Sequence, residues 1–282
     1  MLDRFTSLAD GLDHPECITA GPDGAAYAGG EGGQVYRIAE GAAVEIGSTE
    51  GSLYGVALDS DGAVYACDFG RAQVARVDPH GEVTTYSTGT AERPLRVPNF
   101  AAFSDDGSLY VTDSGDWRGN DGLVFRVAPE GSTEVWSEEP VGFPNGCCVT
   151  ATGDGLLVVE TTERRIVRIP IREDGSAGSM EVVAELPGSL PDGIALAEDG
   201  TMFVGCWRPD RVWRVAPGTD PDVLAEDPDG VTFNQPANVA FVGADLDRLA
   251  VSSLGGWAIV VADVGATGLR LRYPAFGSRW AV

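Results

Sequence analysis

The sequence predicts an all-β fold, a six-bladed β-propeller with four antiparallel strands in each blade. The first observation is a motif of one apolar strand, a tight Asp/Gly turn and a second apolar strand, which occurs six times in the 282 residues. The second is its spacing of about 45 residues, a period typical of propeller blades. The third is that no amphipathic helical pattern interrupts the copies. The copies open at Glu16, Tyr54, Asn99, Asn145, Asp192 and Ala237.

Further strands follow the motif and complete the blades. VYRI, VARV and VFRV, which start at Val35, Val74 and Val124, alternate arginine with apolar residues, as expected of a third strand. A fourth, rim strand comes next in the first five copies. In the sixth copy, either RFTSLAD near the N-terminus or GLRLRYPAF near the C-terminus could supply the missing strand, and the sequence does not choose between them. Because the repeat has no linker, residues 1–282 are predicted to form a single propeller domain.

The charge of the chain points to small-molecule chemistry. The net charge is −24, and all 19 basic residues are arginines. Such an acidic surface argues against nucleic acid and anionic membranes as partners. No apolar run is long enough to span a bilayer, and the N-terminal segment MLDRFTSLADGLD lacks the apolar core of a signal peptide. We therefore expect a cytoplasmic protein that acts on a small molecule, and its oligomeric state is not predicted.

The cysteines and histidines offer little support for nucleophilic catalysis. The five cysteines lie mostly in predicted strands without zinc-type spacing, so we expect them to pack as small apolar residues. This includes the adjacent pair Cys147 and Cys148. Of the two histidines, His80 lies in a turn, and His14 is expected to be a neutral loop residue that could lie near the mouth of the ring.

The residues that open the copies are the candidate site. Equivalent positions of a propeller converge on its axis, and four of them carry oxygen ligands: Glu16, Asn99, Asn145 and Asp192. Two carboxylates and two amides suit one divalent cation, Ca²⁺ first, with Mg²⁺, Mn²⁺ or Zn²⁺ as alternatives. Asn and Asp are also common turn residues before strands, which explains any one of them alone. Four at equivalent positions favour a site.

Other residues are expected to form the walls of this pocket. Tyr54 opens the second copy and is predicted to line the pocket rather than bind metal. The connections after the second strands carry Trp117 and, farther along, Trp207 and Arg208. Loops on one face of a rigid scaffold commonly carry function, so these three are candidates for contact with substrate.

With these motifs in view, the chain resembles the SMP-30/gluconolactonase/luciferin-regenerating-enzyme family of six-bladed propellers. The resemblance rests on these segments: HPE at residues 14–16, PNFAAFSDDGSLYVTDSGDW from Pro98, FPNG from Phe143, PDGIAL from Pro191 and NVAFVGADLDRLAVSSLGGW from Asn238.

The resemblance implies a metal-dependent hydrolase that opens a lactone, typically a sugar lactone. Glu16, Asn145 and Asp192 would hold one divalent cation, often Ca²⁺, which polarises the lactone carbonyl. Asn99 would contact the substrate or a metal-bound water. Asp192 would be the general base for the attacking water.

One position departs from the family pattern and leaves the substrate open. Several sugar lactonases of the group carry an Arg two residues before the substrate-contacting Asn and an Asp after it. Here Arg96 stands three residues before Asn99, and Phe100 follows. Two alternatives to lactone hydrolysis also stay open. One is a lyase, isomerase or strictosidine-synthase-like condensing role, and the other is a non-catalytic ligand-binding propeller.

Overall fold

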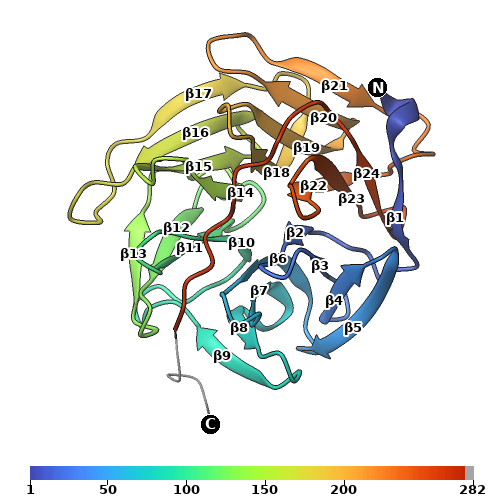
Figure 1. The fold of residues 1–282 in the computed structure, drawn as a ribbon. Coiled ribbons are helices and arrows are strands. Elements are labelled where there is room, and N and C mark those ends of the chain that lie inside the picture. Colours follow the sequence, from blue (N-terminus) through green and yellow to red (C-terminus); the bar gives the residue numbers. More distant parts are fainter. Residues whose placement is uncertain (277–282) are drawn as a thin grey trace.

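The computed structural model describes residues 1–276 and has the predicted architecture, six four-stranded antiparallel sheets arranged as blades around a central axis (Figure 1). The innermost strands are β2 (Thr19–Ala20), β6 (Leu53–Leu58), β10 (Pro98–Phe103), β14 (Pro144–Val149), β18 (Leu190–Leu196) and β22 (Pro236–Val242). The second strands are β3 (Ala26–Gly29), β7 (Val64–Asp68), β11 (Leu109–Asp113), β15 (Gly155–Glu160), β19 (Met202–Arg208) and β23 (Arg248–Ser253).

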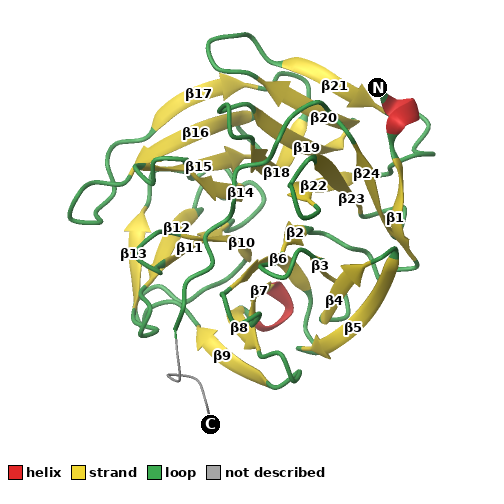
Figure 2. Cartoon of the chain, in the orientation of Figure 1, coloured by secondary structure: helices red, strands yellow, loops and turns green. Residues whose placement is uncertain are grey.

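The outer half of each blade is also strand, and helix is minimal (Figure 2). The third strands are β4 (Gln34–Ala39), β8 (Gln73–Val77), β12 (Leu123–Val127), β16 (Arg165–Pro170), β20 (Asp210–Val215) and β24 (Ala258–Ala262). The rim strands are β5 (Ala42–Ser48), β9 (Val83–Ser87), β13 (Thr133–Ser137), β17 (Glu181–Glu185), β21 (Asp222–Glu226) and β1 (Thr6–Asp10). The described helices are the 3₁₀ turns η1 (Leu2–Arg4) and η2 (Phe69–Arg71).

The N-terminal segment closes the ring, which decides the point that the sequence left open. Strand β1 pairs antiparallel with β24, so the sixth blade is built from both ends of the described chain. An unpaired edge at β24 is thereby removed, and the ring has no gap through which the blades could separate.

The apolar core is divided among the contacts between blades. Each of the buried clusters draws its members from at least two blades, such as Tyr65 of β7 with Phe103 of β10, or Phe203 of β19 with Phe241 of β22. Since a sheet buries one face against another layer, each blade depends on both of its neighbours. Ring closure therefore stabilises every blade.

The recurring arginine of the third strand has a structural partner within its own blade. In the first four blades it reaches the aspartate of the turn between the first two strands, as in the pairs Arg37–Asp23 and Arg126–Asp106. The Arg126 ion pair and hydrogen bonds from Ser104 and Ser108 outweigh the effect of burial and lower the pKa of Asp106 to about 2. The turn aspartates thus have an additional structural role that the sequence pattern did not reveal.

The segment from Asp263 to Phe276, which we call the strap, crosses one end of the ring (Figure 1). Its contacts reach several blades: Gly268 N–H donates to Leu246 O, the Tyr273 hydroxyl donates to Ala20 O, and Ser60 N–H donates to Pro274 O. These partners follow or end the innermost strands, so the strap lies at the end of the axis opposite the residues that open the copies.

The strap also closes a small apolar cavity on the axis. The cavity has a volume of about 80 Å³ and is lined by innermost-strand residues such as Phe100, Ile194 and Val239, together with Leu271 and Tyr273 of the strap. The strap therefore covers this end of the axis.

We expect Arg272→Ala to lower the free energy of unfolding by about 2 kcal/mol, since it removes hydrogen bonds of a charged group to a partly buried site. The guanidinium donates to Asp105 and to the carbonyls of Val149, Thr150 and Ala151. Urea unfolding of the variant is the measurement.

Arg270→Ala is the matched control, because Arg270 is an exposed strap residue. Its effect should stay within about 0.5 kcal/mol. Equal effects of the two variants would show that the strap does not tie the blades together.

Candidate active site

The polar residues that open the copies gather at the mouth of the ring. Asn99, Asn145 and Asp192 lie near the beginning of β10, β14 and β18, and all three side chains are buried. Glu16 lies in the loop before the short strand β2 and is half-buried. The repeat thus correctly predicted that these residues occupy equivalent positions, although in the first blade the strand begins three residues after Glu16.

Electrostatics links the two carboxylates across the axis. Burial, and then repulsion by Glu31, raises the pKa of Glu16 to about 7. Burial, and then the nearby Glu16 charge, raises the pKa of Asp192 well above its usual value, against an opposing hydrogen bond from Asn145. Two carboxylates whose ionisation is disfavoured by burial and by neighbouring negative charge are stabilised by a cation beside them. Their role as metal ligands stays a prediction.

Hydroxyl groups of the second strands' ends orient the two asparagines. The Asn99 amide nitrogen donates to Ser114 Oγ at 3.0 Å, and the Asn145 amide nitrogen donates to Thr161 Oγ1 at 3.3 Å. Each hydroxyl donates in turn to the carbonyl of the proline directly before the next blade's opening residue: Ser114 to Pro144 O, and Thr161 to Pro191 O. The amide nitrogens are therefore engaged, which leaves the carbonyl oxygens as the atoms suited to a cation.

Glycine lets the innermost strands come close enough to bring these side chains together. A Cβ at Gly146 would lie 2.6 Å from Gly193 Cα and 2.7 Å from Asp192 O. No side chain fits in that space, so the residue after Asn145 must lack one. The close approach sets the spacing between Asn145 and Asp192.

The donor set fits a hard divalent cation. Glu16 and Asp192 supply negative charge, and Asn145 supplies an amide oxygen next to them. Ca²⁺ and related ions prefer such carboxylate and carbonyl oxygens, with water completing the coordination. The raised pKa of both carboxyl groups, by burial with Glu31 at Glu16 and by burial with Glu16 at Asp192, is the observation behind this fit, since a cation would offset both causes.

Aromatic side chains form two walls at the mouth. On the second blade Tyr54 stacks on Phe69, with ring centroids 5.0 Å apart and planes 7° apart. Burial and the charges of Glu16 and Asp192 raise the pKa of Tyr54, which places its hydroxyl near both carboxylates. On the other side Trp117 contacts Phe143 at 4.7 Å and Trp207 at 6.1 Å between centroids. Tyr54, Trp117 and Trp207 thus lie at the same end of the ring as the residues that open the copies, and their contact with substrate stays a prediction.

Phe143 is a member of the wall that the sequence analysis missed. It precedes Asn145 by two residues and has a left-handed backbone (φ 56°), which is unfavourable for a bulky side chain. Its N–H donates to Val141 O, and its carbonyl accepts from Thr161 N–H. The FPNG motif was the available signal, but only its Asn was read as functional.

Arg208 and Arg96 differ sharply in their surroundings. Arg208 pairs in register with Leu190, its guanidinium lies 5.7 Å from the Trp207 ring centroid, and its carboxylate partner among the described residues, Asp210, is 4.0 Å away. Arg96 instead forms ion pairs with Asp116 at 2.8 Å and Asp121 at 2.5 Å. Arg96 is thus held by the loop between β11 and β12, whereas Arg208 remains exposed at the mouth.

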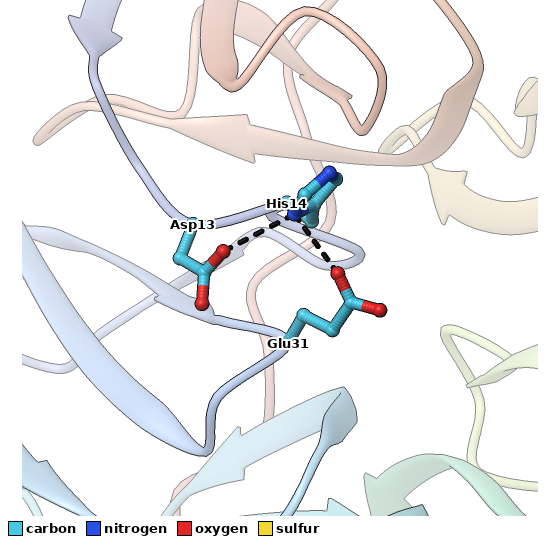
Figure 3. A group of neighbouring side chains, drawn as sticks. All are labelled: Asp13, His14 and Glu31. Carbon is cyan, nitrogen blue, oxygen red and sulfur yellow. Dashed lines mark hydrogen bonds and ion pairs between the residues drawn. The ribbon is translucent and has the colours of Figure 1, made fainter.

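His14 forms a polar cluster with Asp13 and Glu31 in the loop that leads to Glu16 (Figure 3). Its Nδ1 lies 3.1 Å from Asp13 Oδ1 and 2.9 Å from Glu31 Oε2, and its ring packs on Trp257 at 4.5 Å between centroids. Asp13 also accepts from Gly32 N–H and the Gln34 amide. The cluster fixes the loop that delivers Glu16.

The acidic ends of the second strands hold loops and do not face a ligand. Asp68 accepts from Ser52 N–H, Asp113 from Arg96 N–H and Val97 N–H, and Glu160 from Gly142 N–H. These carboxylates are buried and satisfied by the backbone that leads into each innermost strand. They therefore position the mouth instead of lining it.

The cysteines have no catalytic environment. Burial raises the pKa of Cys17 and of Cys148 to about 12, and burial raises the pKa of Cys147 as well. The thiolate is the nucleophile, so these groups are inert at neutral pH.

Within residues 1–276, no helix has the length and apolarity needed to cross a bilayer.

Comparison with known proteins identifies the family of this chain. The model of the SMP-30/gluconolactonase/LRE-like region matches residues 81–255. The chain belongs to this family. Pentonolactonase XacC of Haloferax volcanii is 29% identical over 208 residues, which cover 72% of this chain and 68% of that protein.

Other relatives match shorter stretches. Strictosidine synthase-like 13 of Arabidopsis thaliana is 30% identical over 141 residues, 45% of this chain, and the match spans only 34% of that protein's length. The 6-deoxy-6-sulfogluconolactonase of Pseudomonas putida is 29% identical over 137 residues, 48% of this chain and 45% of that protein.

Solved structures of family members share the fold. A gluconolactonase of Xanthomonas campestris superposes with a TM-score of 0.79 at 19% identity, covering 92% of this chain and 89% of that one. The calcium-binding protein regucalcin of Agrobacterium tumefaciens superposes with a TM-score of 0.78 at 18% identity, covering 96% of each chain. At this identity the likeness shows the six-bladed fold alone.

The Thr161 hydroxyl should be needed to orient Asn145. Thr161→Val preserves shape but removes the acceptor for the Asn145 amide and the donor to Pro191 O. We expect a loss of about 1–3 kcal/mol in the free energy of unfolding, because buried polar partners are left unpaired. Chemical denaturation without added metal measures it.

Thr162→Val is the neighbouring control. Thr162 Oγ1 is buried and has no hydrogen-bond partner among the described residues. Removal of this hydroxyl should leave the free energy of unfolding unchanged or raise it. A Thr161 variant as stable as the Thr162 variant would contradict the proposed orienting role.

Proposed function

We propose that the protein is a divalent-metal-dependent lactonase that uses Ca²⁺. The observation that carries the proposal is the pair of carboxylates Glu16 and Asp192 at the mouth of the ring: burial and then Glu31 raise the pKa of Glu16, and burial and then Glu16 raise the pKa of Asp192. Membership of the gluconolactonase family and the relatives named as lactonases support hydrolysis over other chemistry.

In this proposal Glu16, Asn145 and Asp192 hold the ion. When bound, the cation would polarise the lactone carbonyl and stabilise negative charge on its oxygen. Asn99, oriented by Ser114, contacts the substrate or a water beside the ion. Asp192 would accept the proton of the attacking water, because it is a buried carboxylate beside Glu16 and Asn145 whose pKa is raised by burial and by the Glu16 charge.

The mouth residues bind the rest of the substrate. Tyr54 lies against the carboxylate pair from the second blade, and Arg208 reaches over Trp207 from the blade that carries Asp192. The buried surroundings of the carboxylates exclude bulk water, which strengthens every electrostatic interaction within the site.

The test is Asp192→Asn, which keeps the shape but removes one charge. Ca²⁺ should raise the melting temperature of the wild type, and chelator should abolish both this rise and lactone hydrolysis. The variant should lose the Ca²⁺-dependent rise and at least about 100-fold in kcat/KM, a change of about 2.7 kcal/mol. Without metal it should melt no lower than the wild type, since a buried like-charge pair has been removed.

Asp199→Asn is the control, a turn aspartate of the same blade that accepts from Thr201 N–H. It should keep metal binding and activity. If chelator changes neither melting nor activity of the wild type, the metal-hydrolase proposal is wrong. If metal binds but no lactone or ester is hydrolysed, the hydrolase proposal is wrong, and the lyase, isomerase or condensing role and the non-catalytic ligand-binding role remain.

A further inference from the structure

A second group of side chains of metal-binding type lies in the first blade, apart from the proposed Ca²⁺ ligands. Asp13, His14 and Glu31 each offer one ligand atom, and these atoms all lie within 4.8 Å of one another. Asp13 and His14 belong to the loop before β2, and Glu31 belongs to the connection between β3 and β4 (Figure 3). Among residues 1–276, no other three His, Cys, Asp or Glu side chains come together in this way. Two segments of the blade thus present ligand atoms to one point.

A single nitrogen atom makes both of the contacts that hold this group together. His14 Nδ1 lies 3.1 Å from Asp13 Oδ1 and 2.9 Å from Glu31 Oε2. A ring nitrogen carries at most one proton, so it cannot donate a well-aligned hydrogen bond to both carboxylates. A cation among the three atoms would be bound by all of them, since the lone pair of a neutral imidazole and the carboxylate oxygens are all metal ligands.

The negative charge of the group is not balanced by arginine. Turn aspartates of the chain pair with a third-strand arginine, as Asp23 does with Arg37 at 2.7 Å. Within the described part of the chain, the ion pairs of Asp13 and Glu31 are both with His14. Even a protonated imidazole leaves one of these two carboxylate charges uncompensated. A divalent cation would compensate both and leave the imidazole neutral.

An independent observation beside the group is a buried oxygen that lacks a hydrogen bond. The Gln34 amide nitrogen donates to Asp13 Oδ2 at 3.1 Å, whereas Gln34 Oε1 is buried and has no partner among the described residues. A buried acceptor without a donor is unfavourable. A water bound to a cation at Asp13 would bring a strong donor to this amide group.

We propose that Asp13, His14 and Glu31 form a second cation site, for Zn²⁺, distinct from the proposed Ca²⁺ site. One imidazole nitrogen and two carboxylate oxygens suit Zn²⁺, with water as the fourth ligand, whereas Ca²⁺ takes six to eight oxygens. Ligand atoms of a tetrahedral zinc site lie roughly 3.3–3.6 Å apart. The Glu31 side chain is 64% exposed and free to adjust its position by the small amount required.

Zinc at this position would tie the loop that leads to Glu16 to the connection between β3 and β4. The ion would therefore stabilise the first blade and hold the loop that delivers one proposed Ca²⁺ ligand. It has no step in the reaction proposed above. The inference does not depend on lactone hydrolysis.

The test is a calorimetric titration of the full chain with Zn²⁺ while Ca²⁺ is present in excess to occupy the first site. We expect one Zn²⁺ to bind per chain and to raise the melting temperature, because an ion that binds only the folded chain stabilises it. His14→Gln and Glu31→Gln should each weaken Zn²⁺ binding by at least about tenfold and remove this rise. Absence of Zn²⁺ binding to the wild type would overturn the inference.

Co²⁺ in place of Zn²⁺ reports the coordination directly, since its visible absorption is intense in four-coordinate sites. The wild type should give this absorption and His14→Gln should lose it. Retention of the same spectrum by the His14 variant would overturn the assignment of the imidazole as a ligand.

His80→Gln is the matched control, because His80 is an exposed histidine in a turn of the second blade. It should leave Zn²⁺ binding unchanged, and equal losses in the two histidine variants would show that the ion binds the acidic surface without a specific site. Asp192→Asn should also retain Zn²⁺ binding. If Asp192→Asn abolishes Zn²⁺ binding and His14→Gln does not, zinc occupies the proposed Ca²⁺ site and the second site is refuted.

Discussion

The structure depends on closure of the ring by the pairing of β1 with β24. Every apolar cluster is shared by two blades, so no blade has a core of its own. A ring with one open edge would expose two blade faces and the edge of β24 to water. Pairing the N-terminal strand with β24 covers that edge. The Ser252 hydroxyl in turn links the sixth blade to the first by donating to Glu16 O at 3.0 Å.

That last contact connects the fold to the site. Thr112 donates to Asn145 O in the same way that Ser252 donates to Glu16 O, so hydroxyls on second strands hold the backbone of the next blade's opening residue. Where a hydroxyl is missing, glycine allows direct approach, as at Gly205 against Pro236 O. The positions of the carboxylates and amides at the axis are thus fixed by contacts between blades, and rigidity comes from the ring itself.

Much of this architecture could be predicted from the sequence because it repeats. The period, the turns and the strand patterns are local features, and equivalence around the axis then brings Asn99, Asn145 and Asp192 together. Segments that depart from the repeat were harder to predict from the sequence. The GLRLRYPAF segment reads as a possible strand, yet Arg272 and Tyr273 bind carbonyl groups of distant turns, and no local pattern reveals such partners.

At the mouth of the ring, too, local sequence patterns do not reveal which single residues come into contact. Phe143 joins the wall only because its backbone is left-handed, and Glu31 approaches Glu16 only because His14 and Asp13 hold its loop. The result is an asymmetric opening, acidic at the first blade and aromatic from the third to the fifth. At the boundary between these two sides, the half-buried Glu16 and the buried Asp192 can attract a cation from the acidic side while the aromatic side excludes water. This division lets one opening combine strong charge with an apolar surface, which neither a uniformly acidic nor a uniformly aromatic mouth could do.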